Sequence, residues 1–106
     1  MKAKLELITP GTILKEDFLE PLGITAYKLS KGIKVQQTAV SQIINGKRKI
    51  TVDMALRFSR YFGNSPQFWL NLQNHYELES ERDKKDYLFK EIIPFNHVAE
   101  RKIPYC

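Results

Sequence analysis

Two short helical patterns separated by only three residues restrict this fold more than any other feature of the sequence. The first runs from Thr25, a favourable N-cap, to Ile33, and the second runs from Gln37 to Asn45. Two helices of this length with so short a connection are typical of a helix-turn-helix. In that motif the second helix enters the major groove of DNA, and the residues near its N-terminus face the base edges.

The residue pattern of the second helix predicts an outer face that is polar and uncharged. Val40, Ile43 and Ile44 recur at helical spacing and should point inward. The outer face then holds amide and hydroxyl side chains: Gln37, Thr38, Ser41, Gln42 and Asn45. A glutamine amide donates and accepts hydrogen bonds at once and can bind adenine at both N6 and N7, whereas a carboxylate there would repel phosphates. The alternative interpretation is an ordinary polar surface helix.

Three consecutive cations follow this helix. Gly46 occupies the position where a left-handed residue commonly ends a helix, and Lys47, Arg48 and Lys49 come directly after it. Cations beside the groove would contact backbone phosphates. The net charge of +5 is concentrated in the same half of the chain, since residues 1–62 hold 11 Lys/Arg and 5 Asp/Glu while residues 63–106 hold 6 and 7. This distribution favours a polyanionic partner, although many domains are mildly basic.

The remaining apolar patterns predict three further helices. One begins near Gly11 and should end at Glu20, because Pro21 disfavours helical geometry in the preceding residue. The other two begin at the caps Thr51 and Ser65 and run over Val52–Phe62 and from Pro66 to about Lys84. One side of the last helix carries residues that we expect in a core or dimer contact: Phe68, Trp69, Leu72 and Tyr76. The fold class is therefore all-α, with a five-helix domain over residues 1–83. The C-terminal extension over 84–106 is either a short helix with a tail or a segment that orders only against a partner.

Several other kinds of function find no support in the sequence. The single cysteine, Cys106, excludes an internal disulfide and favours a reducing, cytoplasmic location. No stretch is apolar enough for a membrane span, and the N-terminus lacks a signal-peptide core. His75 and His97 lack further ligands at metal-binding spacing, so we expect no metal, and no phosphate loop or dinucleotide fingerprint predicts a cofactor. We expect a binding protein and not an enzyme.

The runs on either side of the helix-turn-helix point to a family. Before it stands PGTILKEDFLEPLG and after it FGNSPQFWLNLQ, and the whole stretch from Ile8 to Glu79 closely resembles HigA-type antitoxins, also called virulence-associated protein I. These are lambda-repressor-like helix-turn-helix proteins of bacterial addiction modules. The resemblance implies a homodimeric repressor that binds a palindromic operator of its own operon. It also implies a protein partner, a HigB-like toxin that is a RelE-like mRNA endonuclease.

Carried over by position, the resemblance implies two sets of DNA contacts. The base-contacting set is Gln37, Thr38, Ser41 and Gln42, and the phosphate-contacting set is Gln36, Asn45, Lys47, Arg48 and Lys49. The turn departs from the family pattern, because Lys34 stands where a left-handed glycine is frequent, Gly32 replaces a helical residue, and Ser30 replaces a small alanine. We expect the turn to be intact and slightly less stable.

Two other functions remain open at this stage. The chain could be a stand-alone phage-type regulator with no toxin partner. It could also be a helical protein-interaction module that no longer binds DNA. Genomic context separates the first alternative from an antitoxin, and salt-dependent operator binding separates both regulators from the interaction module.

Overall fold

A computed structural model describes residues 7–95, and every regular element within that range is helical. The first helix is continuous and consists of α1 (Pro10–Ile13), η2 (Leu14–Leu19) and α2 (Glu20–Leu22), and it is followed by α3 (Ala26–Ile33), α4 (Gln37–Ile44), α5 (Val52–Phe62) and α6 (Pro66–Phe89). The all-α, five-helix prediction is confirmed. The expectations for His97, Cys106 and the end of the C-terminal tail lie outside the described residues.

The first helix does not end at Glu20, as Pro21 had led us to expect. It continues through Pro21 to Leu22 and ends at Gly23, which has φ of 68°. Its middle part, η2, is a π-helix, in which the backbone N–H of Glu20 donates to the carbonyl oxygen of Lys15 five residues earlier. A π-helical segment shifts the hydrogen-bond register ahead of a proline that has no N–H to donate. The chain therefore accommodates Pro21 inside the helix.

The helical caps agree with the sequence. Thr25, Thr51 and Ser65 each precede a helix and accept a hydrogen bond from the backbone N–H three residues later, at 3.0, 3.2 and 3.1 Å. Each such cap satisfies one of the free donors of a helix N-terminus. The two helices of the motif, α3 and α4, begin and end within one residue of their predicted bounds, although the N-cap of α4, Gln36, forms no side-chain cap hydrogen bond.

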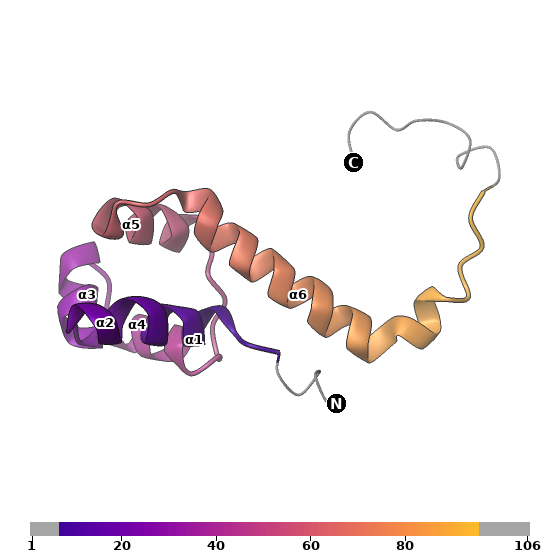
Figure 1. Ribbon diagram of the computed structural model, residues 1–106, viewed down its shortest axis with the longest axis horizontal. Helices are drawn as coiled ribbons and strands as arrows, with labels where there is room; N and C mark the ends of the chain where they lie inside the picture. The colour runs from indigo at the N-terminus through magenta and orange to yellow at the C-terminus, as the bar shows by residue number, and fades with distance from the viewer. Residues whose placement is uncertain (1–6, 96–106) are drawn as a thin grey trace.

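Helices α1 to α5 form a compact body, and α6 starts within it and then runs outward beyond it (Figure 1). The largest fully buried side chains come from all five helices and the loop before α5: Leu14, Leu29, Val40, Ile43, Ile50, Phe58 and Trp69. Trp69 packs on Phe58 with a ring-centroid distance of 5.0 Å, and its indole N–H donates to the side chain of Asn64 at 2.9 Å. The first part of α6 thus belongs to the core.

The outer part of α6 is longer than predicted. The helix passes Lys84 without interruption and ends at Phe89, so the expected short helix of the extension is the last part of α6. Its side chains from Glu77 to Asp86 are mostly charged and exposed. Ion pairs at helical spacing, such as Arg82–Glu79 and Lys85–Glu81, support this part of the helix.

A close approach between the first helix and α4 depends on Gly11. A Cβ atom at this position would overlap the carbonyl oxygen of Ile43 and would lie 2.9 Å from the Cα of Ile44. Both are backbone atoms, which cannot move aside without displacing α4. Gly11 therefore determines how closely the first helix supports the second helix of the motif.

We predict that Gly11→Ala lowers the free energy of unfolding by about 1–3 kcal/mol or more, because the added methyl group overpacks a backbone contact. Glu16→Ala, on the exposed side of the same helix, is the control and should change stability by no more than about 0.5 kcal/mol. Urea unfolding followed by circular dichroism measures both. Equal stabilities of the two variants would contradict the close approach.

Candidate nucleic-acid interface

The turn between α3 and α4 contains a strained residue. Lys34 has φ of 62° and is the only non-glycine residue with positive φ among residues 7–95. Arg57 of α5 holds this turn, because its guanidinium donates to the carbonyl oxygen of Ile33 at 2.7 Å and pairs with Asp53 at 2.8 Å. The expectation that the turn is intact with a left-handed lysine is confirmed. The Asp53–Arg57 spacing of four residues was visible in the sequence, but the contact of Arg57 with the turn was not.

Gly32, the other departure in this region, also has a structural reason. A Cβ atom at Gly32 would overlap the aromatic ring of Tyr61 on α5. The glycine weakens the last turn of α3 locally, but it lets α5 pack close to the motif.

Helix α4 presents its polar side chains to the solvent. Val40 and Ile43 are fully buried, as predicted, and Ile44 is half-buried. Gln36, Gln37 and Thr38 are exposed at the start of the helix, and Ser41 and Gln42 are partly exposed one turn later. All four residues of the predicted base-contacting set thus lie on or near the solvent face of α4.

The loop with three consecutive cations, residues 47–49, lies beside this face of α4, and we call it the basic loop. The Nε of Arg48 donates to the side-chain oxygen of Gln42 at 3.0 Å. Arg48 also lines a concave surface of about 390 Å³ together with Gln36 and Thr38 from the start of α4. The basic loop and α4 therefore form one surface, on which amide groups lie next to a guanidinium group.

A buried glutamine on α6 anchors the other end of the basic loop. Gln73, only 6% exposed, accepts a hydrogen bond from the backbone N–H of Ile50 at 2.9 Å and donates to Glu77 at 3.0 Å. Glu77 in turn pairs with Lys49 at 3.5 Å. Gln73 was not predicted as a functional residue, because nothing in the local pattern distinguishes it from the exposed polar residues around it.

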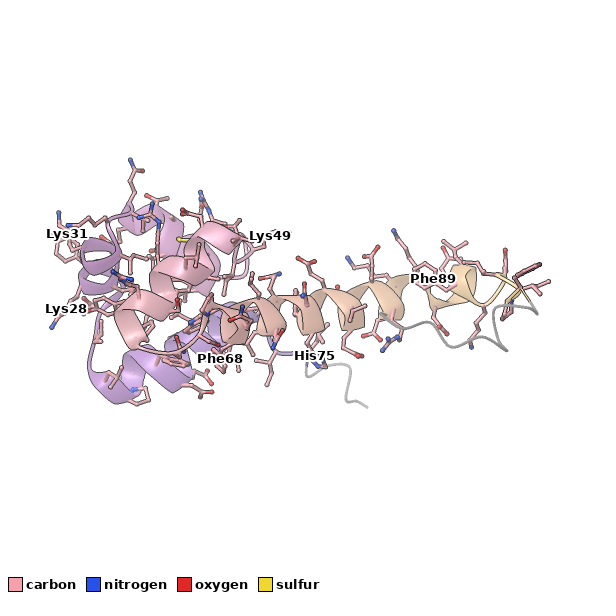
Figure 2. All side chains as sticks on the ribbon, turned by 90° about the horizontal axis from the view of Figure 1, so that it is seen from above. Lys28, Lys31, Lys49, Phe68, His75 and Phe89 are labelled. Carbon is pink, nitrogen blue, oxygen red and sulfur yellow. The ribbon has the colours of Figure 1, made fainter. Side chains whose placement is uncertain are left out.

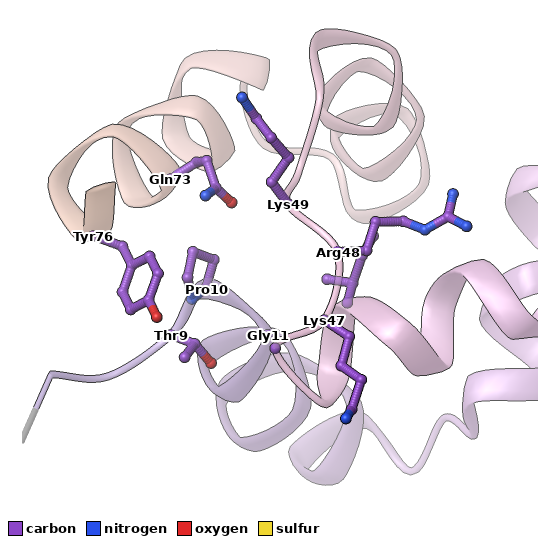
Figure 3. A pocket seen from close by; sticks show the side chains of 10 residues that line it. Thr9, Pro10, Gly11, Lys47, Arg48, Lys49, Gln73 and Tyr76 are labelled. Atoms are coloured by element: carbon purple, nitrogen blue, oxygen red, sulfur yellow. The ribbon is translucent and has the colours of Figure 1, made fainter. Parts of the chain in front are cut away.

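The three cations of the loop point in different directions. Figure 3 shows Lys49 beside α6, Arg48 directed toward α4, and Lys47 directed away from both helices. The loop, the start of α1 and α6 enclose a cavity of about 160 Å³, which Thr9, Gln73 and Tyr76 also line. Because the Lys49–Glu77 pair is largely exposed, it holds Lys49 only weakly.

Further cations lie on the body outside the predicted set. Lys28 and Lys31 lie at the end of the body opposite to α6, whereas Lys49 lies on the side from which α6 leaves (Figure 2). Lys31 stands over the ring of Tyr27 at 5.5 Å. Within residues 7–95, Lys28, Lys34 and Lys47 form no ion pair, which leaves their charges available to an external anion.

The four aromatic and apolar residues expected in a core or dimer contact lie at different depths. Trp69 is fully buried, Leu72 is half-buried against the core, and Tyr76 lines the small cavity beside the loop. Phe68 lies at the surface with its ring edge-to-face on Trp69 at 5.0 Å. Trp69 and Leu72 thus take part in the core, whereas Phe68 and Tyr76 lie at its edge.

Other chemistry has little support in the described part of the chain. Residues 7–95 contain no group of three or more His, Cys, Asp or Glu side chains that could hold a metal ion. None of their helices is both long and apolar enough to cross a membrane. The hydrogen bond and charge of Lys85 lower the pKa of Glu81 below its usual value, but this pair lies on outer α6, away from the basic loop.

Comparison with known proteins decides the family. Residues 15–69 match the helix-turn-helix family model. The chain is 42% identical over 85 residues to virulence-associated protein I of Dichelobacter nodosus, covering 79% of each chain, and 37% identical over 83 residues to antitoxin HigA-1 of Vibrio cholerae, covering 78% of each. The chain belongs to the HigA-type family of helix-turn-helix antitoxins. The sequence-based assignment to this family and to the lambda-repressor-like fold is confirmed.

A solved structure extends the similarity to a DNA complex. A Pseudomonas aeruginosa protein in complex with its 18-bp operator DNA matches with a TM-score of 0.81 and 38% identity, over 83% of this chain and 94% of the other. The HigA-type chain described here therefore shares its fold with an operator-binding relative along most of its length.

We predict that Lys34→Gly raises the free energy of unfolding by about 1 kcal/mol, since glycine adopts the left-handed conformation without strain. The matched control is Lys31→Gly within α3, which should lower stability by about the same amount. Thermal unfolding of both variants measures the difference. A loss of stability in Lys34→Gly as large as that of the control would show that the residue is not strained.

We also predict that Gln73→Leu lowers the free energy of unfolding by about 1–3 kcal/mol, because the buried N–H of Ile50 loses its acceptor. Asn71→Leu, at an exposed position of the same helix, should have little effect. Urea unfolding quantifies the cost, and hydrogen exchange at Ile50 shows whether its amide has lost protection. Unchanged protection of Ile50 in the variant would contradict the anchoring role of Gln73.

Proposed function

We propose that this HigA-type protein is a homodimeric repressor of its own operon that also neutralises a HigB-like toxin. The observation that carries the DNA-binding half is the single surface formed by α4 and the basic loop, where Arg48 contacts Gln42 and shares a hollow with Gln36 and Thr38. Amides at base edges and cations at phosphates are the arrangement that sequence-specific recognition requires.

The proposed contacts divide into two chemical classes. Gln37, Thr38, Ser41 and Gln42 are assigned to base edges in the major groove. The phosphate contacts are Gln36, Asn45, Lys47, Arg48 and Lys49. The amide of Gln42 is oriented by Arg48, so that one residue of the phosphate set also positions one of the base set.

The length of a related operator supports a homodimer. An α-helix rises about 1.5 Å per residue, so the eight residues of α4 extend only about 12 Å, or roughly four base pairs. The P. aeruginosa relative was solved with 18 bp of operator DNA, which is far more than one such helix can read. We infer two half-sites about 34 Å apart, one helical turn of the duplex. We also propose a cytoplasmic location, because a repressor must reach its operator there.

The toxin-binding half of the proposal rests on the family and on the end of α6. Relatives such as HigA-1 of V. cholerae are named antitoxins, and we propose that the partner here is a RelE-like mRNA endonuclease. Tyr87, Leu88, Ile92 and Ile93 are exposed apolar side chains beyond the packed body of the protein. We propose that residues 84–106 form an extension that binds the toxin, separate from a DNA-binding domain over residues 1–83.

Substitutions in the two contact classes should have different effects on DNA binding. Gln37→Ala should weaken the free energy of operator binding by about 1–3 kcal/mol and relax the preference at one base pair. Lys47→Ala should instead weaken binding to every sequence alike. Gel shifts with the operator and with a scrambled duplex, repeated over a range of salt concentrations, measure both effects. If Gln37→Ala weakens binding to the two duplexes equally, Gln37 does not contact a base edge.

Truncation after Lys84 should separate the two activities. The shortened protein keeps all of the core and the basic loop, so we expect operator binding to be unchanged. Rescue of growth from the co-expressed toxin of the neighbouring gene should be lost. Retained rescue would exclude the extension as the toxin site, and the absence of any toxin gene beside this one would favour a stand-alone regulator.

A further inference from the structure

Two glutamines on α4 differ in what their side chains already bind. The side-chain oxygen of Gln42 accepts a hydrogen bond from the Nε of Arg48 at 3.0 Å. Gln37, in the first turn of the same helix, is exposed and forms no side-chain hydrogen bond within residues 7–95. The same kind of side chain therefore occurs on α4 once with a free amide and once with an amide that is already held.

The contact with Arg48 fixes the orientation of the Gln42 amide. A guanidinium group can only donate hydrogen bonds, so the amide oxygen must face it. The NH₂ group of Gln42, with its two donors, is then the end of the amide left for another partner. A hydrogen bond from a charged donor is stronger than one between neutral groups, so this orientation is favoured over the flipped amide.

Arg48 keeps its other donors for a further partner. Within residues 7–95 it forms no ion pair, and its only side-chain hydrogen bond is the one to Gln42. Asp53, a carboxylate that lines the same hollow as Arg48, pairs with Arg57 at 2.8 Å. Because the five donors of a guanidinium group spread over different edges of one plane, its Nη groups can bind a phosphate while its Nε holds Gln42.

We propose that Arg48 makes Gln42 a donor to the DNA, so that Gln42 reads guanine while the free amide of Gln37 reads adenine. Arg48 is then a positioning residue for Gln42. This inference rests on the operator binding of the proposed function and names the bases that two of its contacts select.

The major-groove edges of the two purines explain the difference. Guanine offers two acceptors, N7 and O6, and no donor, so it suits an amide that presents its NH₂ group. Adenine offers the acceptor N7 and the donor N6, and that donor would have to share the Gln42 oxygen with the charged donor of Arg48. Gln37 has no such competitor and can bind N6 and N7 of adenine together.

The first test compares the base pairs that the two glutamines read. Selection from a library of duplexes with a randomised core gives the sequence that the wild-type chain prefers, and loss of preference in Gln42→Ala and in Gln37→Ala identifies each base pair. Titrations of single-base-pair variants should give G·C for Gln42 and A·T for Gln37, each preferred over the other by at least about fivefold. Any other base pair at either position would overturn the proposal.

Arg48→Ala tests the positioning role. The freed amide of Gln42 should accept A·T as well as G·C, so the preference at its base pair should fall to no more than about twofold, while the base pair of Gln37 keeps its preference. Lys47→Ala is the matched control, because it removes the same charge from the same loop. It should lower the affinity for every duplex and leave both preferences intact. An unchanged preference at the base pair of Gln42 in Arg48→Ala would overturn the proposal.

The contact itself can be measured without DNA. In isotopically labelled protein, heteronuclear NMR should show that Arg48→Ala shifts the side-chain amide resonances of Gln42 and leaves those of Gln37 unchanged. Circular dichroism should show a folded variant, since Arg48 lies at the surface. Unshifted resonances of Gln42 would mean that Arg48 does not hold its amide, and the proposal would fail.

Failure of this proposal and failure of the proposed function give different results. If the wild type selects no sequence from the library, sequence-specific repression fails and the base assignments fail with it. If the wild type selects a sequence but Arg48→Ala leaves the base pair of Gln42 unaffected, repression stands and only the role of Arg48 fails.

Discussion

The hydrogen bond between the backbone N–H of Ile50 and the buried side chain of Gln73 determines where the basic loop lies. Ile50 is itself a core residue, so the loop is fixed at its end by both apolar packing and a buried polar contact. Only five residues separate Ile50 from the end of α4. The backbone of residues 47–49 is consequently held close to α4, and α6 supports the basic loop as well as forming part of the core.

The motif is held from both sides by contacts at backbone atoms. The first helix approaches α4 so closely at Gly11 that no side chain fits, and Arg57 of α5 binds the carbonyl oxygen at the end of α3. Contacts of this kind leave little freedom for the angle between α3 and α4. A helix held in this way binds a partner with little ordering cost, because its position is set before the partner arrives.

The molecule separates its surfaces along its length. The face formed by α4 and the basic loop is polar and positively charged, and the end of α6 carries exposed aromatic and aliphatic side chains. Because α6 takes part in the core, supports the basic loop and carries this apolar end, it connects the two surfaces.

Local chemistry in the sequence was sufficient for most helix boundaries and for the inward face of α4, since caps and apolar spacing depend on neighbouring residues, whereas the left-handed lysine was expected from the family resemblance. It failed at Pro21, where a π-helical segment absorbs the proline, and at the end of α6, where charged side chains continue a helix without an apolar pattern. Only the tertiary structure revealed the roles of Gln73 and Arg57. Their partners lie more than 20 residues away or on another helix, and such distances leave no periodic signal in a sequence.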